Sequence, residues 1–321
     1  MLQNYLEEIE KELYTNPLNP QTANLVDPIH YLLQIGGKRI RPILTLMSSK
    51  LFGGKTTDAL SQALAVEVFH NFTLMHDDIM DNSPLRRGAK TVHEKWNINT
   101  AILSGDGMMI QAYALLQKNA NDKFALLFER FNTTAWEVCV GQQMDMDFEK
   151  RTNVSKEEYV EMIRLKTAVL LGCALELGAI QANASKKDQE HIRKFGEYVG
   201  ISFQLRDDYL DTFGKKEEVG KRIGGDILAD KKTFLYLHAL ETGTSSDLEL
   251  LRHFHGSHPN DQEKIASITA IFESTQADQE ILKKSEEYYQ KAIQELNHIS
   301  TPDEQKNELR ALAAWLLERH V

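Results

Sequence analysis

Two short clusters of aspartates carry the clearest chemical signal in this sequence. The first is DDIMD at 77–81, and the second, 130 residues later, is DDYLD at 207–211. Each follows a stretch with helical apolar spacing, and helix positions i, i+1 and i+4 fall within an arc of about 100°. Each cluster therefore presents three carboxylates in one direction, and such hard oxygen ligands favour magnesium over zinc. The expected metal-site residues are Asp77, Asp78, Asp81, Asp207, Asp208 and Asp211.

Basic residues accompany both acidic clusters. GGKRIRP at 36–42 combines a Gly-Gly turn with three cations and a proline suited to a first helical turn. RRG at 86–88 follows the first cluster, and GKRIGGD at 220–226 and KKT at 231–233 follow the second. Taken singly, each basic run is better explained as solvated surface, and each acidic cluster as a solvated helix end. Carboxylates near a helix C-terminus oppose the macrodipole, however, and bound cations would explain two such clusters. Together the motifs indicate a magnesium-dependent site for diphosphate esters.

Proline placement and apolar spacing predict the elements that carry these motifs. Pro84 is the only proline between residues 43 and 258, and proline inside a helix costs about 3 kcal/mol, so long helices fit this region. Period-two runs are absent. Apolar residues recur with helical spacing over 60–69, 124–138, 159–177 and 195–209. We expect an all-α protein in which residues 1–321 form a single domain.

The composition is ordinary for a globular protein and excludes several classes. The chain has 321 residues, 42% of them hydrophobic, and a formal net charge of −10, which argues against nucleic-acid binding. The most apolar stretch, 167–180, contains a glutamate and is too short to span a bilayer. The acidic segment 1–13 is unlike a signal peptide. We therefore expect a cytoplasmic protein without stable membrane insertion, in which Cys139 and Cys173 are reduced core thiols.

In this order, the motifs resemble those of the trans-isoprenyl diphosphate synthase family, also called polyprenyl synthetases. The resemblance covers about 36–233, and it also includes the Lys166-Thr167 pair and FQLRDDYLD. It implies a bundle of long helices around a central active-site cavity, usually in a homodimer. The implied reaction is a head-to-tail condensation of isopentenyl diphosphate with an allylic diphosphate. It would use about three magnesium ions per site, for which manganese can substitute.

The resemblance also implies roles for individual side chains. Asp77, Asp81 and Asp207 would bind metal directly, and the other three aspartates would support them or act through water. The residues matched to the allylic diphosphate site are Arg86, Lys166, Lys221 and Lys231. Those matched to the isopentenyl diphosphate site are Lys38, Arg41, His70 and Arg87. The expected catalytic set is Lys166, Thr167, Gln204 and Lys231, with Thr167 and Gln204 lining the region where the carbocation forms. The departing pyrophosphate is the expected base, and His76 is expected to be a structural histidine.

Residues one to two turns before the first acidic cluster are expected to set the product length. Thr73 precedes Asp77 by one turn on nearly the same face, and it is small enough to let a prenyl tail pass. Phe72 and Phe69 lie to either side and could form a floor. One aromatic in the two positions four and five residues before the cluster resembles geranylgeranyl (twenty-carbon) synthases, whereas two suggest farnesyl (fifteen-carbon) synthases. We expect geranylgeranyl diphosphate, with farnesyl diphosphate as the alternative.

Three other classes fit the motifs less well. A terpene cyclase normally mixes Asn, Ser or Thr with Glu in its second metal motif, and it does not need GGKRIRP. A catalytically silent partner subunit of a hetero-oligomeric synthase tends to lose an aspartate cluster, and both are intact here. A calcium-binding helical protein would show the alternating oxygen ligands of an EF-hand loop, which are missing.

Overall fold

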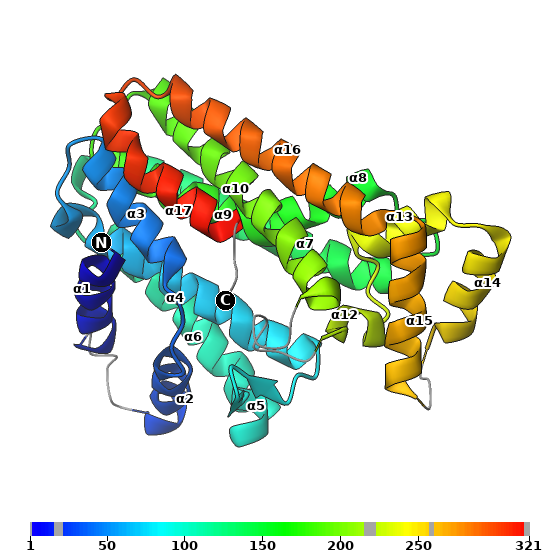
Figure 1. Ribbon diagram of the computed structural model, residues 1–321. Helices are drawn as coiled ribbons and strands as arrows, with labels where there is room; N and C mark the ends of the chain where they lie inside the picture. The colour runs from blue at the N-terminus through cyan, green and yellow to red at the C-terminus, as the bar shows by residue number, and fades with distance from the viewer. Residues whose placement is uncertain (1, 16–21, 215–222, 257–259, 318–321) are drawn as a thin grey trace. The chain divides into compact units, whose positions relative to one another are not determined.

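The computed structural model describes residues 2–15, 22–214, 223–256 and 260–317 (Figure 1). Almost all of this chain is helical, which confirms the all-α prediction. Within the described ranges, the β-structure is one short hairpin. Its strands, Leu85–Arg86 (β1) and Ala89–Lys90 (β2), have two residues each and pair antiparallel. None of the described helices is both long and apolar enough to cross a membrane. The cytoplasmic location stays a prediction.

The contacts divide the chain into two compact units. Unit 1 comprises residues 1–132 and 173–192, and unit 2 comprises 133–172 and 193–321. The divisions fall inside three helices, which are α7 (Phe124–Lys150), α9 (Val169–Gln181) and α10 (Lys186–Phe213). A single domain over the whole chain stays a prediction, and each unit is described by itself below.

Unit 1 is built around one long helix that ends in the first acidic cluster. This helix, α4 (Thr56–Met80), packs against its neighbours through Ala59, Ala63 and Ala65, which are fully buried and allow close approach. The side chain of Asn97 caps the next long helix by accepting a hydrogen bond from the backbone N–H of Thr100. The other helical elements of unit 1 are α1 (Leu2–Thr15), α2 (Ala23–Gln34), α3 (Ile40–Leu51), α5 (Val92–Lys95), α6 (Ile98–Gln117) and η1 (Asn121–Lys123).

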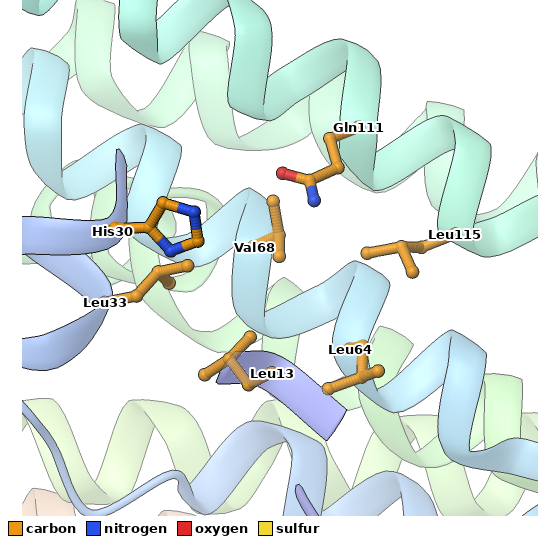
Figure 2. A pocket seen from close by; sticks show the side chains of 7 residues that line it. All are labelled: Leu13, His30, Leu33, Leu64, Val68, Gln111 and Leu115. Atoms are coloured by element: carbon orange, nitrogen blue, oxygen red, sulfur yellow. The ribbon is translucent and has the colours of Figure 1, made fainter. Parts of the chain in front are cut away.

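One small cavity lies beside α4 in unit 1. Figure 2 shows five leucine and valine side chains around it, together with His30 from α2 and Gln111 from α6. Its volume of about 10 Å³ suits one water molecule. Val68 is among the lining residues, and a cavity of this size has no room for a prenyl chain.

Unit 2 packs its helices around an apolar core that contains Phe148, Leu205, Phe234 and Phe272. Two helices start with a capping box, in which Ser155 pairs with Glu158 and Thr244 with Asp247. The elements of unit 2, besides its parts of α7, α9 and α10, are α8 (Lys156–Ile163), the π-helical segment η2 (Arg164–Ala168), α12 (Gly225–Leu228), α13 (Phe234–Thr242), α14 (Ser245–Phe254), α15 (Asp261–Ser274), α16 (Ala277–His298), η3 (Asp303–Lys306) and α17 (Asn307–Leu317).

Neither of the two cysteines forms a disulfide bond, and only one of them is a core residue. Cys173 is buried, but Cys139 is exposed, so the prediction that both are core thiols is wrong for Cys139. That prediction was based on the apolar residues next to Cys139 in the sequence. Val138 is buried, whereas the next residue of a helix points about 100° away from it.

Candidate active site

The first acidic cluster occupies the last turn of α4 and divides into two kinds of carboxylate. Asp78 is only 2% exposed, and both of its oxygens accept hydrogen bonds of 2.9 Å from Arg86 Nε. Burial raises the pKa of Asp78, although Arg86 acts in the opposite direction. Asp77 is half-buried, with an oxygen 3.9 Å from Arg86 Nη2, and Asp81 is exposed at the C-cap. Asp77 and Asp81 are therefore the more exposed members of the cluster.

A tight hairpin presents the two arginines that follow this cluster. Arg87 (φ 52°) and Gly88 (φ 78°) form a two-residue turn between β1 and β2, and both have the positive φ that such turns require. The hydroxyl of Tyr31 donates to the carbonyl of Lys90 at 2.7 Å, and that of Thr91 donates to the carbonyl of Ser83 at 2.8 Å. These contacts fix the hairpin to α2 and to the end of α4.

The Gly-Gly turn at 36–37 brings the hairpin and the start of α3 together. A Cβ on Gly37 would lie 2.8 Å from Arg87 Nη1, so glycine lets this guanidinium pack closely against the turn, and Gly37 also has a positive φ of 152°. Arg39 has a left-handed φ of 48° and is buried, and it donates to Glu67 Oε1 at 2.6 Å and to the Leu33 carbonyl at 2.5 Å. Arg39 therefore has a structural role. The sequence analysis did not identify Glu67, because in the sequence it is only a single acidic residue within an apolar stretch.

Arg41 and His70 form the centre of a positively charged group in unit 1. Arg41 Nη1 lies 3.1 Å from His70 Nε2. Burial, and then the charges of Arg41 and Arg87, hold the pKa of His70 well below its usual range, so the imidazole is neutral and accepts the Arg41 hydrogen bond. Burial also lowers the pKa of Arg41 to about 10 and lowers that of Arg87. Unit 1 thus brings Arg41, His70 and Arg87 together, while Lys38 is exposed on the same Gly-Gly segment.

The second acidic cluster lies near the end of α10 in unit 2. Asp208 is 4% exposed and accepts hydrogen bonds from the hydroxyl of Tyr159 and, at 3.0 Å, from Gln204 Nε2. Burial, and then the charge of Asp226, raise the pKa of Asp208 well above its usual range. Asp207 is half-buried and next to it on the helix. Asp208, like Asp78 in the first cluster, is therefore buried and hydrogen-bonded within its own unit.

The third aspartate of this cluster holds the turn that follows α10. Asp211 Oδ2 accepts the backbone N–H of Asp226 at 3.0 Å, and its carbonyl accepts that of Gly224 at 2.7 Å. Asp226 Oδ1 in turn lies 3.9 Å from Lys231 Nζ. Asp226 was not among the predicted site residues, although it directly follows the glycine pair of GKRIGGD. Lys221, predicted to bind the allylic diphosphate, lies outside the described residues.

Lys166 and Thr167 lie in the π-helical segment η2. Such segments interrupt α-helices with poorer hydrogen bonding and occur often at functional sites. A Cβ on Gly141 of α7 would lie only 2.3 Å from the backbone nitrogen of Lys166, so glycine is required there. Lys166 Nζ forms an ion pair of 2.6 Å with Asp145 Oδ2. Gly141 and Asp145 were missed, because nothing local in the sequence connects them with a lysine more than 20 residues away.

Tyr159 marks the place where the acidic groups of unit 2 converge. Burial raises the pKa of this phenol well above its usual range, and the charges of Asp208, Asp226 and Asp145 act in the same direction. One buried hydroxyl is therefore hydrogen-bonded to Asp208 of α10 and is also affected by the charges of Asp226 from α12 and Asp145 from α7. This concentration of negative charge, with Lys166 and Lys231 each paired to one of its members, suits a cation-bearing site.

The predicted chain-length residues occupy two different environments. Phe69 is fully buried, with its ring centroid 5.3 Å from that of Phe131 and 5.5 Å from that of Phe72. Phe72 is half-buried, and the His76 ring meets it edge-on at 4.8 Å. His76 Nε2 lies 3.1 Å from the Ile102 carbonyl, and Gly105 leaves room for the ring, as expected for a structural histidine. Thr73 donates its hydroxyl to the His70 carbonyl at 2.8 Å.

Known proteins share both the sequence and the fold of this chain. The family model for polyprenyl synthetase matches residues 22–272. The chain belongs to the polyprenyl synthetase family. A short chain isoprenyl diphosphate synthase of Methanothermobacter thermautotrophicus is 33% identical over 99% of this chain and 98% of its own. The crystal structure of a geranylgeranyl pyrophosphate synthase superposes with a TM-score of 0.95 at 45% identity, covering 100% of this polyprenyl synthetase and 99% of that chain.

A third similar protein has a structure that contains magnesium. It is the structure of geranylgeranyl pyrophosphate synthase from Corynebacterium glutamicum in complex with isoprenyl diphosphate and magnesium, with a TM-score of 0.85 at 29% identity, covering 99% of this chain and 97% of that one. The polyprenyl synthetase described here is accordingly a prenyltransferase of the short-chain trans-prenyl diphosphate synthase class, as its motifs predict. Its family uses magnesium together with isopentenyl and allylic diphosphates.

Proposed function

We propose that this synthase makes geranylgeranyl diphosphate by adding isopentenyl diphosphate to shorter allylic diphosphates. The observation that carries this proposal is the pairing of Phe72 with Thr73 in the turns of α4 that lead to Asp77. Thr73 is small and its hydroxyl is occupied by the backbone, while Phe72 is held in place by His76. The 45% identity to a geranylgeranyl pyrophosphate synthase supports the same product. Phe69 packs against Phe72 and adds a second ring, which favours farnesyl diphosphate as the alternative product.

The aspartates that would hold magnesium are Asp77, Asp81 and Asp207. Their carboxylates are half-buried or exposed, and the two clusters supply oxygen donors without histidine or thiolate, which is the donor set that magnesium prefers. When bound, magnesium supplies positive charge against the negative charge that grows on the leaving diphosphate. Asp78 and Asp208 are buried and hydrogen-bonded within their own units, and they hold Arg86, Tyr159 and Gln204 in position.

Fixed cations of the chain are proposed to hold the allylic diphosphate. Lys166 forms an ion pair of 2.6 Å with Asp145, which keeps its ammonium group oriented before substrate arrives, and Lys231 lies 3.9 Å from the carboxylate of Asp226. Arg86 is fixed by Asp78 in the same manner, and Lys221 belongs to the proposed set. Groups that are oriented in advance stabilise the leaving diphosphate selectively as its charge develops, because they need no reorganisation during the reaction.

The arginine and histidine group of unit 1 is proposed to bind isopentenyl diphosphate. Arg41 and Arg87 bring two guanidinium groups together, and burial has already lowered their pKa values, so a diphosphate would relieve their mutual repulsion. Neutral His70 accepts a hydrogen bond from Arg41 and so orients its guanidinium fork. Lys38 would add an exposed positive charge.

Two polar side chains are proposed to face the carbocation. Gln204 uses its amide nitrogen to donate to Asp208, which leaves its carbonyl oxygen as the atom that can meet a developing positive charge. Thr167 would offer its hydroxyl oxygen from the π-helical segment. The apolar rings near Phe72 keep water from quenching the cation. The proton lost after the new carbon–carbon bond forms is proposed to go to the released diphosphate.

The product length should change when Phe72, the proposed floor for the growing prenyl tail, is replaced. Replacing Phe72 by alanine deletes a half-buried ring that lies one residue from the predicted path of the tail, so products longer than twenty carbons are expected. Chromatography of the products formed from farnesyl diphosphate and labelled isopentenyl diphosphate measures this. Tyr288→Ala is the matched control, because it also removes a half-buried ring, but from α16 of unit 2, and its product distribution should match that of the wild type. An unchanged distribution for Phe72→Ala would remove this residue as the floor.

We further propose that the protein is a homodimer that associates through α6. Leu103 and Ile110 are 60% and 68% exposed and lie seven residues apart on one face of the helix. Ile98 and Ile102 of the same helix are also exposed. Exposed apolar side chains gathered on one element are typical of an interaction surface, and a second copy of the chain is the partner proposed here.

Introducing a charge at this face should yield a monomer. Ile110→Glu places a carboxylate in an apolar interface, and light scattering after size exclusion should show half the wild-type mass. Lys187→Glu, a change at an exposed position near the start of α10, should leave the mass unchanged. A wild-type protein that is already monomeric, or an Ile110→Glu variant that keeps its dimer mass, would contradict the proposal.

A further inference from the structure

A buried lysine outside the predicted site closes a ring of hydrogen bonds in unit 2. Lys264 of α15 is 1% exposed, and a buried ammonium group is costly without close partners. Its Nζ donates to Asp230 Oδ1 at 2.7 Å and to the Gly256 carbonyl at 2.9 Å. The backbone N–H of Gly256 donates to Asp230 Oδ2 at 2.9 Å. The three residues thus bind one another in a closed ring, and both oxygens of Asp230 are used.

Asp230 lies directly before Lys231, in a backbone conformation that few residues adopt. Its φ is 53°, in the left-handed region that Gly, Asn and Asp tolerate best. Its N–H donates to the Ile227 carbonyl at 3.2 Å, and the N–H of Lys231 donates to the Asp226 carbonyl at 3.0 Å. The path of the chain into Lys231 is therefore set by the left-handed turn at Asp230.

The residue after Lys231 is anchored as well. Lys232 Nζ donates to the backbone carbonyls of Phe148 and Glu149, at 2.8 and 3.0 Å, near the end of α7. The backbone of Lys231 is thus fixed on both sides by its neighbours, whereas its own side chain is 44% exposed. This combination suits a charged group that must reach a ligand from a defined starting position.

We propose that Lys264 is a positioning residue of the diphosphate site, which fixes the turn at Asp230 and thereby presents Lys231 to the allylic diphosphate. The inference rests on the proposed role of Lys231. Lys264 itself is buried behind the turn and touches no substrate. Sequence alone does not show the connection, since Lys264 is a single lysine within a helical segment and lies 34 residues from Asp230.

The test compares two substrates in one set of variants. In Lys264→Met the side chain keeps its length and loses its charge, so the turn is no longer fixed while the fold retains its packing. We expect the KM for the allylic diphosphate to rise about tenfold, as is typical when a charged contact is displaced. The KM for isopentenyl diphosphate should stay within about twofold, because its proposed binding group lies in unit 1.

Two further variants separate positioning from stability. Lys306→Met removes another buried lysine of unit 2, whose Nζ donates to the Asn297 carbonyl at 3.3 Å, and it should lower the melting temperature without changing either KM. Asp230→Asn keeps the left-handed preference and one oxygen acceptor for Lys264, so its allylic KM should lie between those of the wild type and Lys264→Met. If Lys264→Met folds poorly, the double variant with Asp230→Asn, which leaves no unpaired charge, replaces it.

The outcomes distinguish this inference from the function on which it rests. An allylic KM that is unchanged in Lys264→Met, or two KM values that rise together, would overturn the positioning role. A wild-type protein that does not condense the two diphosphates at all would instead contradict the proposed function.

Discussion

Replacing Asp77 or Asp207 by alanine is expected to reduce kcat by about 10²- to 10³-fold while leaving the melting temperature nearly unchanged. Each carboxylate is proposed to hold magnesium against the leaving diphosphate. Removing it should therefore destabilise the transition state more than it destabilises the fold. Both side chains are half-buried, whereas the neighbouring Asp78 and Asp208 are buried. Asp77 is half-buried and 3.9 Å from Arg86 Nη2, a distance at which an ion pair contributes little to stability.

The adjacent aspartates provide matched controls. Asp78→Ala would leave Arg86 without its two 2.9 Å hydrogen bonds, and Asp208→Ala would leave Tyr159 and Gln204 without their shared acceptor. These variants should lose about 1–3 kcal/mol of the free energy of unfolding as well as activity. Steady-state kinetics and thermal melts of the four variants measure both effects. Unfolding of Asp77→Ala and Asp207→Ala, with stable Asp78→Ala and Asp208→Ala, would reverse the assignment.

The second large effect is expected on stability, from Gly141→Ala. The added Cβ would lie 2.3 Å from the backbone nitrogen of Lys166 and 2.7 Å from the carbonyl carbon of Leu165. These are backbone atoms that cannot turn aside, so α7 and the π-helical segment must separate. We expect a loss of at least about 3 kcal/mol and a melting temperature lower by about 5–10 °C.

Gly107→Ala is the control for this change. At this position in α6 the nearest side-chain atoms to an added Cβ are 3.8 Å away, which is ordinary contact. Because alanine is the better helix former, Gly107→Ala should be neutral or stabilising by up to about 1 kcal/mol. Calorimetric melts of both variants test the prediction. A Gly141→Ala protein that melts with the wild type would show that η2 does not need this close approach.

The acidic clusters were predictable from the sequence because their signal is local. A run such as DDIMD needs only the helical period to show that its carboxylates point one way, and its position at the end of an apolar stretch places it near a helix end. The helices themselves were predictable for the same reason, from apolar spacing and the scarcity of proline. The family resemblance then added roles that spacing alone does not supply.

What the sequence could not show were the partners that lie far apart along the chain. Asp145 pairs with Lys166, and Lys264 with Asp230, at separations of 21 and 34 residues, where no helical period connects the residues. The distinction between the aspartates of one cluster also depends on tertiary contacts. Asp78 and Asp77 are neighbours of the same type, and only the hairpin that carries Arg86 decides which of them is buried.

We propose that this synthase stops at twenty carbons, and an assay of the purified wild-type protein measures the product length. Dimethylallyl diphosphate or farnesyl diphosphate is supplied with labelled isopentenyl diphosphate and magnesium, and the dephosphorylated products are sized by chromatography. We expect a twenty-carbon product to accumulate from both primers and no product to form when magnesium is chelated. A product that stops at fifteen carbons, with farnesyl diphosphate left unextended, would contradict this proposal.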